Sequence, residues 1–361
     1  MALLNIFAGN IAYKSIKENG LKPDQISGVF GASGAAKWLS IYGLDRAIYQ
    51  DWLTESTHPI HLFGTSVGAW KFAAAAQKAP GIALDAFATA YIEQSYPDGF
   101  SHEAIRSETE SILNAFLSEN AVKEILSHPF FRFHCGAVTS NGFFASETKT
   151  ILAAALGLAA ARNLVSPRLL RKSFSRTIFS DPRDQFPLHK TITHNTKPIQ
   201  LIESNFRQVI QASGSIPYVM PAVTNIEGAP NAVYRDGGLM DYHPAPGILW
   251  GGEGLILYPH FYSHIIPGWF DKPFRKRYAT EALLSQTVLI CPSADFIKTL
   301  PYERLPDRND FKRFQKDDTL RIRAWREVAA RSHALGEEFK TIHEQNAWRD
   351  VVQPIKNAAI Q

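Results

Sequence analysis

The chain has 361 residues, of which 45% are hydrophobic and 20% are charged, and its formal net charge at pH 7 is +4. This length allows a substantial buried core, and the small net charge does not favour a nucleic-acid-binding protein. The two cysteines, Cys135 and Cys291, lie in apolar runs without metal-ligand spacing around them. We therefore expect buried, reduced thiols rather than a disulfide scaffold, and we expect no metal site.

The first eight residues are apolar but lack the leading positive charges of a secretory signal. The longest apolar run, from Ile151 to Ala161, is too short to span a bilayer and is typical of a buried helix. These features predict a cytoplasmic protein with neither a signal peptide nor a transmembrane helix.

Short apolar strands alternate with helical segments along most of the chain. Residues Ile26–Phe30 and Ile60–Phe63 each lead into a glycine-containing turn and then a helical pattern, of which Trp70–Lys78 is the clearest. Further strands are expected at Phe131–Val138 and Leu255–Tyr258. The alternation predicts an α/β fold with a mostly parallel sheet.

Two regions depart from this alternation. Residues from about 145 to 198 combine an alanine-rich helix, a basic stretch and a proline-containing loop, which indicates an insertion or cap. Residues 301–361 are charged and helical, and we interpret them as a C-terminal helical extension of a domain that spans residues 1–300. One apolar stripe on this extension is expected to pack on the body of the protein, or else to contact a partner or a membrane. The stripe consists of Trp325, Val328, Ser332, Leu335, Phe339 and Ile342.

The stretch GASGAAK, residues 31–37, follows the first of these strands and has part of a phosphate-binding loop pattern. Gly31 and Lys37 have the required spacing, but Ala36 replaces the second glycine. Trp38 stands where a hydroxyl must bind magnesium, which an indole cannot do. We therefore expect no nucleotide, and the loop is either a plain turn or a set of backbone donors for another anion.

Ser66 lies in the pattern G-x-S-x-G, between an apolar strand and a helix. This context is typical of a nucleophile elbow, in which a sharp turn exposes the serine hydroxyl. Gly64 and Gly68 relieve the crowding where strand and helix close around the turn. Ser66 occurs too early in the chain for an ordinary α/β-hydrolase, in which more of the sheet precedes the elbow.

The sequence Asp236-Gly237-Gly238 follows a short strand. A carboxylate at a strand end, followed by two glycines, can be aimed at a neighbouring loop. The alternative is a self-contained Asp-Gly turn.

Together these segments resemble the patatin-like phospholipase family, which has a glycine-rich oxyanion loop, a G-x-S-x-G nucleophile and an Asp-Gly-Gly or Asp-Gly-Ala base, in that order. Residues 209–221, with Ala212-Ser213 followed by Pro217 and Pro221, match a fourth family segment upstream of the base. The resemblance covers roughly residues 26–244. It implies a three-layer α/β/α fold with a mostly parallel central sheet, and a catalytic domain within residues 1–300.

The resemblance also implies a function: a lipid acyl hydrolase that cleaves acyl esters through an acyl-enzyme, with Ser66 as nucleophile and Asp236 as proton acceptor. The motif glycines Gly64, Gly68, Gly237 and Gly238 would support this dyad. The oxyanion hole would use N–H groups of Gly31, Ala32, Ser33, Gly34 and Val67, although alanine and serine interrupt the family's run of adjacent glycines. The substrate would be a phospholipid or another acyl ester, and the chemistry requires no cofactor.

Two alternatives remain open at this point. One is a Ser-Asp-His triad that uses His260 or His264, and the other is a catalytically weak lipid-binding or interaction module on the same fold. In addition, Arg168–Arg176 and Pro267–Arg277 mix basic and apolar residues. They are either surfaces for peripheral membrane contact or solvated basic loops.

Overall fold

The computed structural model describes residues 2–97, 99–193, 196, 198–314 and 317–355. Its central sheet has the strand order β10-β1-β9-β8-β2-β3-β4-β5-β6, and β7 pairs with β4. The strands are β1 (Leu4–Ala8), β2 (Ile26–Gly31), β3 (Ile60–Thr65), β4 (Phe131–Ser140), β5 (Phe174–Ser180), β6 (Ile199–Gln200), β7 (Val233–Asp236), β8 (Leu255–Pro259), β9 (Thr287–Pro292) and β10 (Val352–Pro354). The four strands expected from the sequence are confirmed as β2, β3, β4 and β8.

The sheet is mostly parallel, as expected. At the centre of the sheet, the pairs β8–β2, β2–β3 and β3–β4 are parallel. The pairs β4–β5, β4–β7 and β1–β9 are antiparallel. The fold is therefore a mixed α/β fold, and the carboxyl ends of β2 and β3 lie side by side with Gly31 opposite Gly64.

The helices are α1 (Asn10–Asn19), α2 (Tyr42–Arg46), α3 (Val67–Ala75), α4 (Pro80–Glu93), α5 (His102–Phe116), α6 (Glu119–Ser127), α7 (Lys149–Val165), α8 (Lys190–Thr193), α9 (Glu203–Gly214), α10 (Pro246–Leu249), α11 (Ala294–Thr299), α12 (Asp310–Arg313), α13 (Asp318–Glu344) and α14 (Trp348–Val351). Every residue of α3 is buried, because this helix packs on β2 and β3 and is covered by α4 and α9. Even its lysine is inside, where Lys71 Nζ lies 2.9 Å from Asp45 of α2. The helix that begins after Ser66 is thus held on all sides.

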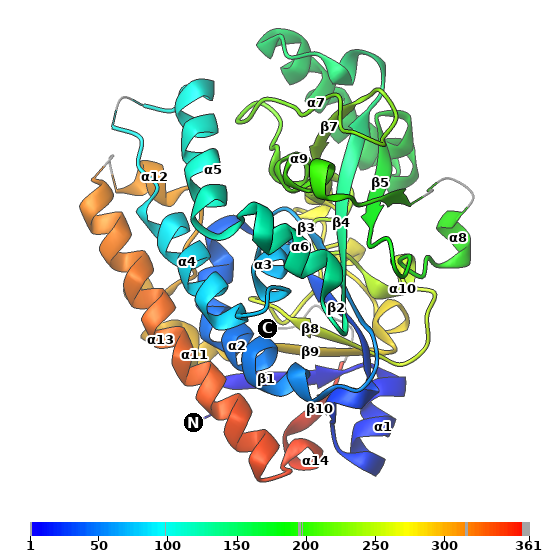
Figure 1. Ribbon diagram of the computed structural model, residues 1–361, viewed down its shortest axis with the longest axis vertical. Helices are drawn as coiled ribbons and strands as arrows, with labels where there is room; N and C mark the ends of the chain where they lie inside the picture. Colours follow the sequence, from blue (N-terminus) through cyan, green and yellow to red (C-terminus); the bar gives the residue numbers. More distant parts are fainter. Residues whose placement is uncertain (1, 98, 194–195, 197, 315–316, 356–361) are drawn as a thin grey trace.

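The C-terminal region joins the body of the protein. Helix α13 packs against α2 and α4, and all six residues of its apolar stripe are buried, so the packing interpretation is confirmed. The region also adds β10, which pairs in parallel with β1 at the edge of the sheet (Figure 1). A three-residue edge strand has too few residues to show an apolar period, and the sequence analysis did not anticipate it. Residues 315–316 and 356–361 of the expected extension lie outside the described residues.

The region expected as a cap has two parts. Helix α7 packs with Leu170 and Phe174 in a small apolar cluster that is separate from the main core, in the upper part of Figure 1. Strand β5 instead belongs to the central sheet. The run from Ile151 to Ala161 is helical, as expected, but it is buried on one face only. Leu152, Ala155 and Ala159 are buried, whereas Ile151 is 44% exposed. Residues 194–195 and 197 of this region lie outside the described residues.

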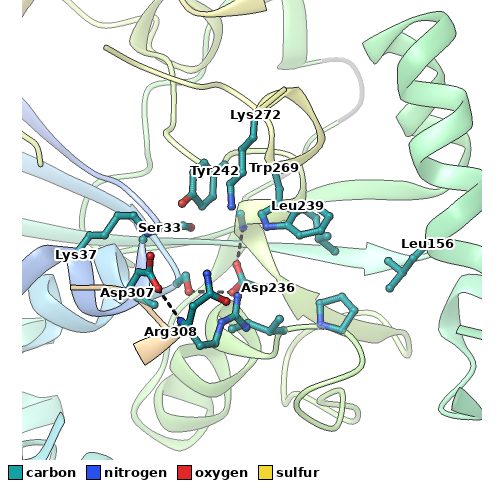
Figure 2. A pocket seen from close by; sticks show the side chains of 17 residues that line it. Ser33, Lys37, Leu156, Asp236, Leu239, Tyr242, Trp269, Lys272, Asp307 and Arg308 are labelled. Carbon is teal, nitrogen blue, oxygen red and sulfur yellow. Dashed lines mark hydrogen bonds between the residues drawn. The ribbon is translucent and has the colours of Figure 1, made fainter. Parts of the chain in front are cut away.

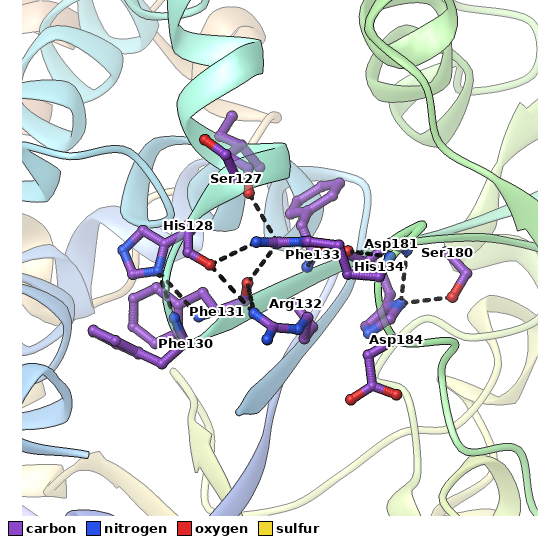
Figure 3. A network of polar contacts seen from close by, with 12 residues as sticks. Ser127, His128, Phe130, Phe131, Arg132, Phe133, His134, Ser180, Asp181 and Asp184 are labelled. Atoms are coloured by element: carbon purple, nitrogen blue, oxygen red, sulfur yellow. Dashed lines mark hydrogen bonds and ion pairs between the residues drawn. The ribbon is translucent and has the colours of Figure 1, made fainter. Parts of the chain in front are cut away.

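A network of polar contacts fixes the amino-terminal halves of β3 and β4 (Figure 3). His61 Nδ1 lies 2.9 Å from His134 Nε2, and His134 Nδ1 lies 3.0 Å from Ser180 Oγ. Arg183 binds Asp181 and also donates to the His128 carbonyl. Because this network lies toward the opposite end of β3 from Ser66, we assign it to the assembly of the sheet.

Both cysteines are buried free thiols, as expected. None of the described helices combines the length and the apolar character needed to cross a membrane.

Candidate active site

Ser66 occupies a strained turn between β3 and α3. Its φ of 52° and ψ of −131° are unfavourable for a residue with a side chain, at a cost of about 1–3 kcal/mol. The flanking glycines are required by close backbone approach: a Cβ on Gly68 would lie 2.3 Å from the Gly31 carbonyl oxygen, and one on Gly64 would lie 2.5 Å from the Ala69 nitrogen. The turn is further fixed by Ser213 Oγ, which accepts the Ser66 N–H at 2.9 Å.

The Ser66 hydroxyl donates a hydrogen bond of 2.9 Å to Asp236 Oδ2. The other carboxylate oxygen, Oδ1, accepts the Gly238 N–H at 2.7 Å. Asp236 is the last residue of β7, and a Cβ on Gly237 would lie 2.3 Å from the Gly136 carbonyl oxygen of β4. The structure thus brings Ser66 and Asp236, which are 170 positions apart in the sequence, into direct contact.

Burial raises the pKa of Asp236 from its ordinary value to about 6. The hydrogen bonds from Gly238 and Ser66 favour the carboxylate and limit this rise, as do the positive charges of Arg308 and Lys272. The carboxylate is therefore ionised at neutral pH but holds a proton more readily than an exposed aspartate does.

The residues expected to form an oxyanion hole have different surroundings. The Ser33 N–H donates to the Tyr242 carbonyl at 2.8 Å, so it is already occupied. The Ser33 hydroxyl lies 2.9 Å from Thr65 Oγ1, which itself donates to the Asp241 carbonyl. Gly31 is the last residue of β2 and Ala32 follows it, and neither residue lines the smaller of the cavities beside Ser66.

Gly34 and Ala35 stand at the start of the 3₁₀ helix Ala35–Ile41, where N–H groups have no intrahelical acceptor. Both residues line a cavity together with Ser66, and Val67 begins α3 on the other side of the serine. Ala35 was not among the residues expected from the sequence, because it lies one position beyond Gly34, the last glycine of the loop.

Two cavities meet at Ser66. The smaller, of about 200 Å³, contains the polar side chains shown in Figure 2, among them Lys37, Tyr242 and Lys272. The larger, of about 590 Å³, is lined mostly by apolar and aromatic side chains. They include Trp70, Tyr91, Tyr96, Phe100, Ile105, Ile112, Val219, Met220, Phe311 and Trp325. Ile216 and Pro217, in the segment noted in the sequence, line both cavities.

The two histidines considered as a third catalytic residue have other partners. His260 Nδ1 accepts the Tyr262 N–H at 2.8 Å, and burial holds the pKa of this histidine well below its ordinary value. His264 stacks on the rings of Tyr262 and Tyr278. Within the described part of the chain, the Asp236 carboxylate accepts hydrogen bonds from Ser66 and Gly238, and no histidine is among its partners.

The two basic stretches also differ from each other. In Arg168–Arg176, Leu170 and Phe174 are buried in the small apolar cluster, so they are not displayed to a membrane. In Pro267–Arg277, Trp269 is 40% exposed and lines both cavities, whereas Phe270 is buried. The second stretch therefore reaches the site, and its Lys272 was not expected there.

The chain matches no protein-family model and no curated protein. Among solved structures, it is similar to VipD from Legionella pneumophila, with a TM-score of 0.32 and 13% sequence identity. The similarity covers 71% of this chain and 53% of the VipD chain, so the present chain spans about half of that length.

The raised pKa of Asp236 predicts a pH-dependent stability difference between the wild-type protein and Asp236→Asn. The native state takes up a proton near pH 6 and the unfolded chain near pH 3.8, so the wild type loses stability as the pH rises through this window. Asparagine does not titrate. Chemical unfolding from pH 4 to pH 8 should show the wild type losing up to about 3 kcal/mol relative to the variant, mostly below pH 7. A difference that does not change with pH would contradict this assignment.

Proposed function

We propose that the protein is a patatin-type serine lipid acyl hydrolase, with the three-layer arrangement of that family, and that Ser66 and Asp236 form its catalytic dyad. The observation that carries the proposal is the 2.9 Å hydrogen bond from the Ser66 hydroxyl to the buried Asp236 carboxylate, at an elbow that opens into two cavities. A serine that donates directly to a carboxylate has a proton acceptor without an intervening imidazole.

In the proposed reaction, Asp236 accepts the Ser66 proton while Oγ attacks the ester carbonyl. The oxyanion that develops is stabilised by N–H groups at the start of the 3₁₀ helix, from Gly34 and Ala35, together with the Val67 N–H. The proton passes to the departing alcohol. Water then attacks the acyl-enzyme while Asp236 accepts a proton from it. That proton passes to Ser66 Oγ as the bond between Oγ and the acyl carbon breaks, which releases the fatty acid and restores both residues.

The raised pKa of Asp236 supports this role. An aspartate with an ordinary pKa is a weak base, whereas a desolvated one binds the serine proton more strongly and is still ionised at pH 7. The apolar lining of the larger cavity supports an acyl chain as the group bound there. The positions of His260 and His264 give no support to a triad.

Replacement of Ser66 by Ala or Asp236 by Asn should lower kcat for acyl-ester hydrolysis by at least about 10³-fold, and the double variant should be little worse than either single one. A fluorophosphonate probe should label Ser66 in the wild type and in His264→Gln, but not in Ser66→Ala. Near-normal turnover by folded Asp236→Asn would refute the dyad. Loss of labelling in folded His264→Gln would instead favour a triad.

The substitution Gly34→Ala should lower kcat by about 10²-fold, the scale for the loss of an oxyanion donor. A Cβ at this position would lie 2.4 Å from Cζ of Phe261, so the peptide or the ring must move. Gly157→Ala on α7, where a Cβ meets nothing within 4 Å, is the matched control and should keep full activity. If Phe261→Leu restores the activity of Gly34→Ala, displacement of the loop is the cause, whereas full activity of Gly34→Ala alone would remove this loop from the mechanism.

We further propose that the enzyme contacts lipid surfaces peripherally, through α7. This helix exposes Leu164 and Val165 at 61% and 77%, next to the exposed Arg168 and Arg171. Apolar side chains beside basic ones are suited to the interface of an anionic bilayer, where each basic residue adds about 1 kcal/mol.

The double substitution Leu164→Ser/Val165→Ser should weaken cosedimentation with vesicles that contain anionic phospholipid by at least about 10-fold, because it removes the apolar part of the contact. Ile82→Ser on α4 is the control, since Ile82 is 75% exposed but lies on another helix. Equal binding by both variants would refute a contact through α7.

A further inference from the structure

Three cationic side chains enter the smaller cavity from three separate parts of the chain (Figure 2). Lys37 comes from the 3₁₀ helix Ala35–Ile41, Lys272 follows the 3₁₀ turn Trp269–Asp271, and Arg308 precedes α12. Lys37 lies 235 positions before Lys272, which lies 36 positions before Arg308, so the folded chain gathers these charges of one sign beside Ser66. Arg308 also lines the larger cavity.

In the described part of the chain, none of these three cations forms an ion pair. Lys272 instead lies over aromatic rings, with its Nζ 3.9 Å from the ring centre of Tyr242 and 5.2 Å from that of Trp269. Stacking of this kind holds the ammonium group in place without neutralising it.

The two carboxylates that line the same cavity, Asp236 and Asp307, accept hydrogen bonds from groups other than the three cations. Asp236 accepts hydrogen bonds from Ser66 and Gly238, and Asp307 accepts the Asn309 N–H at 2.7 Å. The cavity therefore holds three cations against two carboxylates that have other partners.

The cations also act on one another. Burial, with the charges of Lys37 and Arg308, lowers the pKa of Lys272 to about 7, against a smaller opposite effect of Asp236. Burial likewise lowers the pKa of Lys37, and the charge of Arg308 adds to this, while Asp307 and Asp310 oppose it. Lys37 and Lys272 are partly buried, whereas Arg308 is exposed, and an anion placed among the three would relieve the burial and the repulsion of the two lysines.

We infer that the smaller cavity is a subsite for an anionic phosphate group carried by the acyl substrate, held by Lys37, Lys272 and Arg308. The inference rests on the proposed function, because it takes Ser66 as the point where the substrate's ester lies. The two cavities then divide the substrate: the apolar one receives the acyl chain, and the cationic one receives the phosphate on the alcohol side of the ester. A volume of about 200 Å³ suits a small head group such as glycerol phosphate.

Ether lipids test the subsite without catalysis, because an ether in place of the ester cannot be hydrolysed. We would measure by isothermal titration calorimetry the binding of 1-O-hexadecylglycerol 3-phosphate and of 1-O-hexadecylglycerol, each below its critical micelle concentration, and of inorganic phosphate. The two ethers differ only in the phosphate. The wild-type protein should bind the phosphate-bearing ether at least about 10-fold more tightly than the neutral ether, and more tightly than inorganic phosphate.

Lys272→Met and Arg308→Gln should reduce this preference to less than about 3-fold. Lys276→Met is the matched control, because it removes an exposed cation from the same segment outside the cavity lining, and it should keep the preference. Equal binding of the two ethers by the wild type, or the same loss of preference in Lys276→Met, would overturn the inference. Equal affinity for inorganic phosphate would also overturn it, since the anion would then be free rather than part of a lipid. The calorimetry measures binding of ethers that are not hydrolysed, so the phosphate preference can be interpreted even if the catalytic dyad proposal fails.

Discussion

The candidate site depends on the close approach of glycine backbones around Ser66. Gly68 of α3 lies against the backbone of Gly31 at the end of β2, and Gly237 after β7 lies against that of Gly136 in β4. A side chain at either contact would push apart the segments that carry Ser66, Asp236 and the loop after β2. Because these contacts are made between backbones, they fix the position of the peptide N–H groups as well as that of the side chains.

A polar network also holds the loop after β2, the end of β3 and the segment after Asp236 together. The hydroxyl groups of Ser33 and Thr65 are hydrogen-bonded to each other, and both residues donate to the backbone of the segment after Asp236. In that segment, the Asp241 carboxylate forms a bidentate ion pair with Arg176 of β5, at 2.6 and 2.8 Å. Arg176 is 11% exposed at its side chain, so this pair is largely withdrawn from water. The strained conformation of Ser66 thus persists because its neighbours leave the turn no alternative conformation.

The parts of the site that could be predicted from the sequence are those in which local geometry demands a residue type. A serine between two glycines at a strand end, and an aspartate before two glycines, each reflect a tight turn, and the structure brings Ser66 and Asp236 into contact. The central strands could be predicted for a similar reason, since a strand buried on both faces has a continuous apolar run. Strand β10 has three residues and no such run, so it could not be recognised from the sequence. Helix α7 has an exposed face as apolar as its buried one, so the sequence does not indicate which of its residues are buried.

The cationic cavity could not be predicted in this way, because Lys37, Lys272 and Arg308 share no spacing and meet only in the folded chain. Their charges nevertheless act on the Asp236 carboxylate. Lys272 and Arg308 both lower the pKa of Asp236, while burial raises it, and the value of about 6 reflects the balance. An anion bound among the cations would offset their effect, so the carboxylate would hold a proton more strongly when the subsite is filled. A bound anion would thus shift the pKa of Asp236 upward, in the same direction as burial does. The cations that line the cavity therefore act on the Asp236 carboxylate as well as on any anion placed among them.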